Sequence, residues 1–248
     1  MRSCRPAVLA AVAGLAMSLY IYLKPPLAKL APILRLPWIE NLPGDLPAYA
    51  LRFLCSFLLL GLLPLITALA LGERPADLGL RLPRALRPRW LTPLLAALIL
   101  AGVLLGAHNP ELSTFYPFSR TLTRAGRGWG FLLHSLLYVL LYYLPWELLF
   151  RGILLFPFVR LFDERFPDRA WSGGWSVPMT FVVLQAIPAA LLHFGHPFLE
   201  TLAALPFGIA AGWLALRTGS ILPGLALHAL AGIGQDLFNT LRALGAMP

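Results

Sequence analysis

The stretch YLPWELLFRGILLF, from Tyr143 to Phe156, decides how this chain folds, because it places two opposite charges inside a long apolar run. Residues 131–162 contain only three charged side chains, and two of them, Glu147 and Arg151, lie near the middle. An isolated charge at the centre of a bilayer costs roughly 2.5–3.5 kcal/mol. At a spacing of four residues, the two side chains share one face of a helix and can neutralise each other. We therefore predict an intramembrane ion pair, which either links two helices or belongs to a buried site.

The rest of the sequence has the composition of a membrane protein. Of its 248 residues, 58% are hydrophobic and 12% are charged, whereas soluble domains carry roughly 25% charged residues. Most apolar runs approach the roughly 20 residues that span hydrocarbon as a helix. We predict an all-α, polytopic transmembrane bundle in one domain, residues 1–248, with seven spans, or eight if 152–162 crosses separately. The seven runs are 7–23, 47–71, 90–107, 131–144, 177–192, 199–216 and 221–241.

The net charge of +9 does not indicate a nucleic-acid partner, because the arginines are scattered through short loops. Basic loops of this kind set the orientation of a membrane protein. The densest group lies in residues 73–89, and we expect it on the cytoplasmic side, next to anionic lipid headgroups. That orientation also places the N-terminus in the cytoplasm. The predicted localisation is therefore the cell membrane, with the lipid bilayer as the partner of a multi-pass protein.

A second polar stretch, LLHFGHPFLE, contains His193, His196 and Glu200. Gly195 and Pro197 indicate that one helix ends near His196 and that the next begins near Pro197. Glu200 would then lie in a first turn, where a carboxylate is favoured. The alternative is a helix that continues through Pro197, with His193 and Glu200 on one face.

The third polar stretch, LPGLALHALAGIGQDLF, places His228 inside an apolar span, with Gln235 and Asp236 two turns further on. Polar side chains at this depth either join helices by hydrogen bonds or belong to a functional site. Of the charged, histidine and amide side chains that we place at membrane depth, with Arg52 left near a helix end, only His134 precedes residue 145. We therefore expect the chemistry in the second half of the chain.

Glu147, His193 and His228 come from three different spans and can form two kinds of site. They can bind a divalent metal such as zinc, with a position left open for water. They can also act without metal, if a carboxylate–histidine pair activates water and another histidine stabilises the developing oxyanion. Both arrangements suit hydrolysis of an amide bond. The sequence contains no HExxH, GxSxG or P-loop signature.

The order and spacing of these stretches resemble the CAAX-protease and bacteriocin-processing (CPBP, Abi) family of intramembrane endopeptidases. Its members carry Glu-Glu-x-x-x-Arg, Phe-x-x-x-His and His-x-x-x-Asn/Asp/Ser on separate transmembrane helices. The resemblance covers residues 75–240, with the motifs at 146–152, 189–193 and from His228. It implies cleavage of membrane-presented peptides or prenylated proteins. The catalytic residues that it implies are Glu147, His193 and His228, and the supporting residues are Arg151, His196, Glu200 and Asp236.

The chain departs from these motifs at three positions. Trp146 occupies the place of the first glutamate, Ala189 that of the phenylalanine, and Gly232 that of the polar residue in the third motif. The sequence is thus similar to a Trp-Glu-x-x-x-Arg variant of the family, in which Glu147 or Glu200 would activate the water.

In such a variant, Gln235 or Asp236 would replace the polar partner that Gly232 does not supply. Two other functions stay open at this point. One is a non-catalytic relative that acts as a membrane scaffold or immunity factor and keeps the polar cluster for packing. The other is a proton-coupled transporter that uses Glu147 and Glu200 as a relay.

Overall fold

The computed structural model describes residues 4–23, 41–84, 90–106, 108–125, 128–169 and 177–246. Within these ranges the chain forms helices and no strand, which confirms the predicted all-α class. Arg2 and part of the basic 73–89 connector lie outside the described residues.

Within the described parts of the chain, four helices are long and apolar enough to cross a membrane. They are α1 (Arg5–Leu23), the continuous run of α4 (Leu46–Cys55), η2 (Ser56–Leu62) and α5 (Leu63–Ala70), the helix Trp129–Arg165, and α13 (Phe198–Thr218). Three more long helices complete the bundle: α6 (Leu91–Gly106), α12 (Val177–Leu191) and α14 (Leu222–Ala243). The first two of these are shorter and apolar, and α14 carries polar side chains in its second half. Six of these helices coincide with predicted runs to within two residues, and the fourth in chain order extends well beyond the predicted 131–144.

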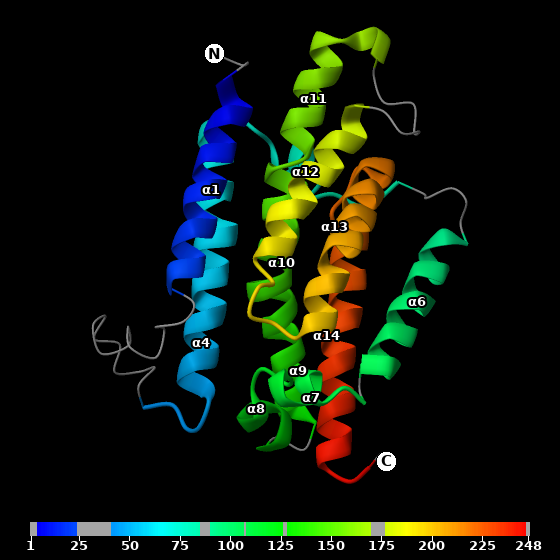
Figure 1. Ribbon diagram of the computed structural model, residues 1–248. Coiled ribbons are helices and arrows are strands. Elements are labelled where there is room, and N and C mark those ends of the chain that lie inside the picture. The colour runs from blue at the N-terminus through cyan, green and yellow to red at the C-terminus, as the bar shows by residue number, and fades with distance from the viewer. Residues whose placement is uncertain are drawn as a thin grey trace.

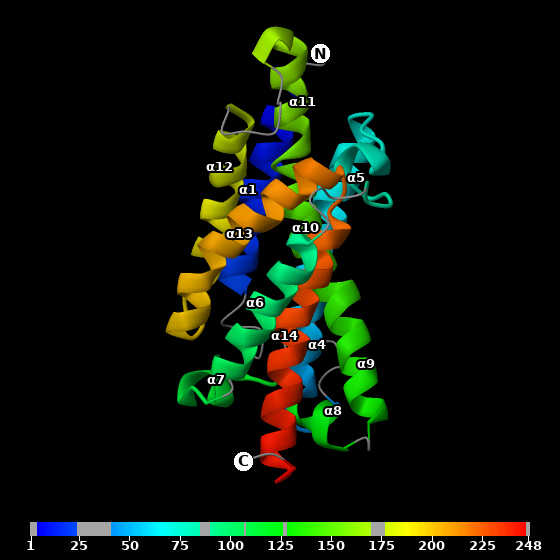
Figure 2. The ribbon, with the colours of Figure 1, turned by 90° about the vertical axis from the view of Figure 1, so that its right-hand side faces the viewer.

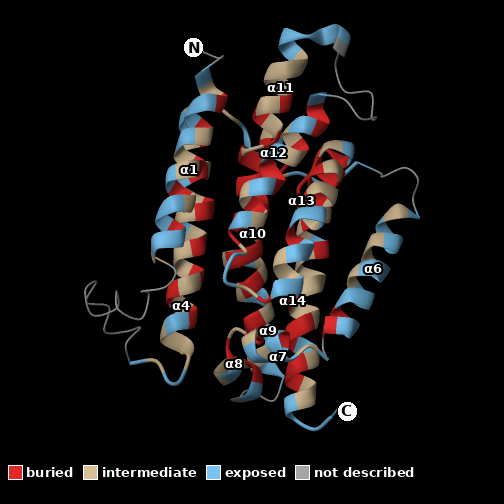
Figure 3. Cartoon of the chain, viewed as in Figure 1, coloured by how far each residue is buried: buried red, intermediate tan, exposed pale blue. Residues whose placement is uncertain are grey.

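The helix Trp129–Arg165 is 37 residues long and runs through the centre of the bundle (Figures 1 and 3). It consists of α9 (Trp129–Leu137), η4 (Tyr138–Tyr143), α10 (Leu144–Glu147), η5 (Leu148–Ile153) and α11 (Phe156–Arg165). The predicted run 131–144 and the optional run 152–162 both belong to it. The optional run is therefore a continuation of the same helix, and a separate eighth crossing does not occur. We refer to Trp129–Arg165 as the central helix.

Two segments of the central helix, η4 and η5, are π-helical, and they flank α10. Pro145 lies between them and has no N–H to donate to the preceding turn. The π-helical η2 packs against α10, and a Cβ atom at Gly61 would lie 3.2 Å from Pro145. The absence of a side chain at Gly61 thus allows the two helices to approach closely at membrane depth.

Aromatic side chains fill the core between the central helix and α4. Phe53 contacts Tyr138 and Tyr142, with ring centroids 5.5 and 5.4 Å apart. Tyr142 stacks on Trp146 at 5.8 Å. These rings are almost fully buried and fix the face that α10 presents to its neighbours.

The N-terminus and the end of α11 lie at one end of the bundle, and the C-terminus, α7 (Pro110–Phe115) and α8 (Arg120–Ala125) lie at the other (Figure 1). The connector that contains η3 (Pro75–Leu78) lies at the same end as the N-terminus, where Arg160 donates to the carbonyl of Asp77 at 3.1 Å. Arg81 donates to the Gly219 carbonyl at 2.7 Å beside it. α1 and α4 lie on one side of the central helix (Figure 1), and α6 lies along α14 on the opposite side (Figures 1 and 2).

Candidate active site

Glu147 is fully buried at the end of α10, and its carboxylate contacts two side chains, His228 and Arg151. Its Oε1 atom accepts a hydrogen bond from Nδ1 of His228 on α14 at 2.9 Å. Because a carboxylate can only accept, this bond requires the proton on Nδ1. The same oxygen lies 3.3 Å from Nη1 of Arg151, so the ion pair expected from the sequence is present. The carboxylate therefore fixes the orientation of the His228 ring.

Gly224 allows α14 to pass close to this carboxylate. It precedes His228 by one helical turn and so lies on the same face. A Cβ atom at position 224 would lie 2.7 Å from Oε2 of Glu147. A larger residue would push α14 away and would weaken the bond between Glu147 and His228.

Arg151 is also buried, and its charge is balanced locally. Besides the carboxylate of Glu147, the guanidinium lies 5.9 Å from the ring centre of Phe150 and 5.8 Å from that of Phe207. Aromatic faces at about 6 Å attract a cation. The two charges in the middle of the apolar run thus compensate each other inside the protein.

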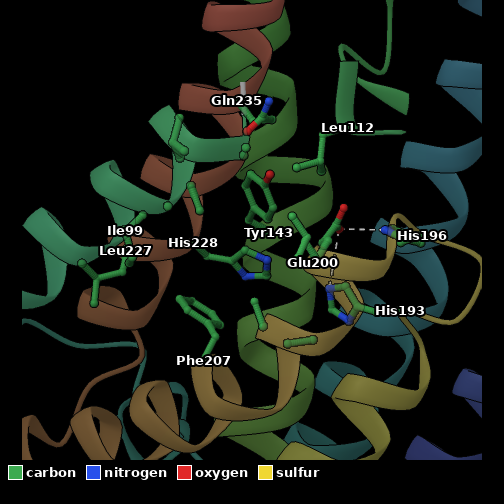
Figure 4. A pocket seen from close by; sticks show the side chains of 18 of the residues that line it. Ile99, Leu112, Tyr143, His193, His196, Glu200, Phe207, Leu227, His228 and Gln235 are labelled. Atoms are coloured by element: carbon green, nitrogen blue, oxygen red, sulfur yellow. Dashed lines mark hydrogen bonds and ion pairs between the residues drawn. The ribbon is translucent and has the colours of Figure 1, made fainter. Parts of the chain in front are cut away.

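A cavity of about 580 Å³ lies between the central helix, α6, α13 and α14. Its walls are mainly apolar, and a few polar side chains point into it (Figure 4). Those from the sequence-predicted site are His193, His196, Glu200 and His228. Glu147 lies behind His228 and is not part of the lining. The structure therefore brings the predicted histidines and one carboxylate, Glu200, to a single cavity.

The chain breaks between α12 and α13 as expected from Gly195 and Pro197, although the first helix ends five residues before His196. α12 ends at Leu191, α13 begins at Phe198, and Glu200 lies in its first turn. Gly195 has a φ of +89°, a conformation that favours glycine, in the turn between the two helices.

This turn places both histidines beside Glu200. Nδ1 of His196 lies 2.8 Å from Oε1 of Glu200, and Nε2 of His193 lies 4.0 Å from the same oxygen. Oε2 of Glu200 is buried and has no hydrogen-bond partner among the described residues. The ring of Trp146 lies against His193, with centroids 5.2 Å apart. A carboxylate from α13 thus stands near the residue that replaces the first motif glutamate.

The structure does not bring Asp236 into this cavity. Its Oδ2 atom lies 2.5 Å from Nε2 of His134 on α9. Nδ1 of His134 lies 3.0 Å from the hydroxyl of Tyr49 on α4. Because α14 is regular from Leu222 to Ala243, Asp236 stays two turns away from His228. Asp236 therefore cannot support His228 as expected, and the isolated His134 proves to be its partner.

Gln235 lines the cavity, and its side-chain amide donates to Asn239 at 3.3 Å. Sequence reasoning missed Tyr143, which lines the same cavity and whose ring lies 4.3 Å from that of His228. The sequence shows only that Tyr143 precedes Glu147 by one turn and that Gly232 follows His228 by one turn. That Tyr143 faces Gly232 depends on how α14 packs on the central helix.

The side chains named for a metal site do not fit one as they lie here. Among the residues that the structure describes, no group of three or more histidine, cysteine, aspartate or glutamate side chains could hold a metal ion. Glu147 is turned to His228 and Arg151 rather than to the cavity. A zinc site built from Glu147, His193 and His228 therefore stays a prediction that this arrangement does not support.

One comparison with known proteins gives a match. Residues 128–233 match the model of the Rce1-like family, described as type II CAAX prenyl endopeptidase Rce1-like. The matched segment contains Glu147, His193, Glu200 and His228, and it lies inside the 75–240 core expected from the sequence. No curated protein and no solved structure matches the chain.

Proposed function

We propose that the protein is an intramembrane endopeptidase that cleaves membrane-presented peptides, because residues 128–233 match the Rce1-like family model. The observation that carries this proposal is the convergence of Glu200, His193 and His228 on one cavity inside a bundle of membrane-spanning helices. Trp146 replaces the first glutamate of the motif, but the site still contains a carboxylate, because Glu200 on α13 lines the cavity.

In the proposed reaction, Glu200 is the general base. Its side chain lines the cavity, and we propose that its carboxylate holds the attacking water there. The carboxylate takes one proton as the water oxygen attacks the carbonyl carbon of the peptide bond. The C–O bond forms, and the electron pair of the C=O bond moves to the carbonyl oxygen.

The proton then moves from Glu200 to the leaving nitrogen, and His193, whose Nε2 lies 4.0 Å from Oε1 of Glu200, is proposed to assist the transfer once the substrate is bound. The C–N bond breaks, and its electron pair stays on the nitrogen. The products are a carboxylic acid and an amine, so one water is consumed for each peptide bond.

His228 is proposed to stabilise the oxyanion. When both of its nitrogens carry a proton, Nδ1–H donates to Glu147 and Nε2–H is left to donate to the substrate oxygen. Glu147 is then a positioning residue, because it acts through His228 and does not line the cavity. This arrangement favours Glu200 over Glu147 as the base.

The apolar walls of the cavity suit a substrate with a lipid chain. α6 contributes Leu95, Leu98 and Ile99, and α13 contributes Ala203 and Phe207. We therefore propose a prenylated or otherwise lipid-modified peptide as the substrate class. Sites that bind such groups are mostly apolar, with a few polar groups that fix the orientation.

The experiment is cleavage of a prenylated model peptide by the purified protein in detergent. Glu200→Gln removes the base without changing the size of the side chain and is expected to abolish turnover. Glu164→Gln is the matched control, since Glu164 is exposed on α11, and it should cleave like the unaltered protein. If Glu200→Gln cleaves at the full rate, this mechanism is wrong. If no variant and no unaltered protein cleaves, the non-catalytic scaffold becomes the better explanation.

We further propose that the protein lies in the cell membrane with its N-terminus in the cytoplasm. The basic side chains of Arg74, Arg81 and Arg160 lie at the same end of the bundle as the N-terminus, which agrees with the positive-inside rule. Cys4 is an exposed free thiol and tests this directly in a Cys55→Ser background. A membrane-impermeant maleimide should label Cys4 only after the cells are permeabilised, and labelling of intact cells would reverse the orientation.

A further inference from the structure

Tyr143 combines burial with access to the candidate active site. It ends the π-helical η4, and its side chain is only 3% exposed. It nevertheless lines the cavity next to His228 (Figure 4), and it contacts Gly232. Its ring lies 4.3 Å from the His228 ring at an interplanar angle of 39°. The central helix thus presents a phenol directly against the imidazole proposed to stabilise the oxyanion.

The hydroxyl of Tyr143 occupies the space in which a side chain at residue 232 would begin. A Cβ atom added to Gly232 would collide with Oη of Tyr143 and would lie 2.7 Å from its Cζ atom. Gly232 follows His228 by one helical turn and lies on the same face of α14. The third motif places a polar side chain at this position, and here α14 supplies none. Tyr143 brings an O–H group to the same place from the opposite helix.

We propose that the Tyr143 hydroxyl donates a hydrogen bond to the oxyanion of the tetrahedral intermediate, in place of the polar side chain of the third motif. Together with Nε2–H of His228, it gives the oxyanion two donors. The phenol keeps its proton throughout and forms no covalent bond. This inference rests on the proposed function and adds a catalytic residue that the motifs do not contain.

The first test is Tyr143→Phe, which removes the hydroxyl and keeps the ring that packs on His228. Loss of one oxyanion donor lowers kcat by about 10²–10³-fold in other hydrolases. We expect a loss of about 10²-fold in kcat with KM changed by less than about twofold, since the donor acts in the transition state. Tyr22→Phe is the matched control, because Tyr22 is 78% exposed at the end of α1, and its kcat should not change.

The second test separates a chemical role from a packing role. Tyr143→Leu removes the hydroxyl and opens space beside Gly232, and the double variant Tyr143→Leu, Gly232→Asn returns an N–H donor to the site from α14. We expect the double variant to recover at least about tenfold in kcat over Tyr143→Leu alone. A side chain that serves only to pack the core predicts no such recovery.

The outcomes distinguish this inference from the proposed function. If the unaltered protein cleaves, Glu200→Gln does not, and Tyr143→Phe retains full kcat, the role of Tyr143 is overturned and the endopeptidase stands. If the unaltered protein does not cleave, both proposals fall. Unfolding midpoints in detergent show that each variant is folded before its kinetics are compared.

Discussion

Two histidine–carboxylate pairs join the central helix to α14, and they differ in what lies beyond the imidazole. Glu147 of the central helix holds His228 of α14, whose side chain is 15% exposed and lines the cavity. Asp236 of α14 holds His134 of the central helix, and both of these side chains are 0% exposed. The second nitrogen of His134 is engaged by Tyr49. Among the described residues, the second nitrogen of His228 has no hydrogen-bond partner.

The comparison shows that the same two functional groups can serve chemistry or packing. A carboxylate fixes an imidazole equally well in both places. A free nitrogen that faces a cavity can exchange a proton or donate to a substrate, whereas a ring bonded at both nitrogens can only hold helices together. Substitutions at His228, His134, Asp236 and Glu147 test this distinction, and a last one at Arg74 gives a pair outside the membrane for comparison. They are ordered by the size of the effect expected.

His228→Ala should have the largest effect, because it removes the imidazole that faces the cavity. General acid–base and oxyanion groups each contribute about 10²–10⁴-fold. We expect turnover of a prenylated peptide to fall by about 10³–10⁴-fold, with an unfolding midpoint near that of the unaltered protein. The same substitution at the sealed pair, His134→Ala, should lower the midpoint strongly and change turnover of the folded fraction little. If the two variants exchange these effects, the distinction is wrong.

Asp236→Ala should have the next largest effect, on stability. Removal of one partner from a buried pair costs about 3–5 kcal/mol, and here it leaves the buried His134 nitrogen without its acceptor. The measurement is the unfolding midpoint in detergent. Asp236→Asn keeps an acceptor oxygen and should recover part of the loss. A midpoint unchanged by Asp236→Ala would mean that this pair does not hold α9 against α14.

Glu147→Gln should have a smaller effect, on turnover. The amide keeps the shape of the side chain and still offers an oxygen to Nδ1 of His228, but it loses the charge. Residues that orient a functional histidine are typically worth about 10–100-fold. We expect a loss in kcat within that range. If Glu147→Gln lowers kcat as much as Glu200→Gln does, Glu147 takes part in the chemistry itself and is not only a positioning residue.

Arg74→Gln should have the smallest effect, since it alters an exposed pair outside the membrane. Hydrogen bonds from Arg74 lower the pKa of the Asp77 carboxyl. A lowered pKa stabilises the folded state above the pKa of about 3.9 in the unfolded chain. That stability is lost as the pH falls through the folded-state value. The variant should therefore show a slightly lower unfolding midpoint at pH 7 and no difference at low pH. An equal difference at both values would rule out the ion pair as its cause.

The sequence predicted the seven long helices because their apolar runs are long and are separated by polar connectors rich in proline and glycine. It also predicted the pair between Glu147 and Arg151, since helical spacing alone brings them together. It could not predict that Asp236 pairs with His134, because 102 residues separate them and only the packing of α14 on α9 joins them. The continuity of the central helix through Pro145 was likewise hidden, since proline is ambiguous between an end and a bend.

The roles of the two glutamates were also undecided in the sequence. Glu200 lies four residues from His196, whereas Glu147 lies 81 residues from His228. This spacing does not show which carboxylate faces the cavity, because the difference is one of direction. Glu147 points to α14, where Gly224 leaves room for it, and Glu200 points to the cavity. Such directions depend on which helix lies opposite, and no local pattern contains that information. Tyr143 was missed for the same reason, because its place in the site depends on its contact with Gly232 of α14.

The central helix is longer than the hydrocarbon of a bilayer is thick, so part of it must lie outside the hydrocarbon. At about 1.5 Å per residue, its 37 residues extend for about 55 Å, and hydrocarbon is only about 30 Å thick. Even a tilt of about 40° would leave it roughly 10 Å too long to be immersed. Because its last turn carries Glu164 and Arg165, we expect this end of the helix to lie outside the hydrocarbon (Figure 1). A spin label placed at successive positions from Phe156 onward would read the depth of the lipid surface directly, and with it the depth at which a peptide bond meets Glu200.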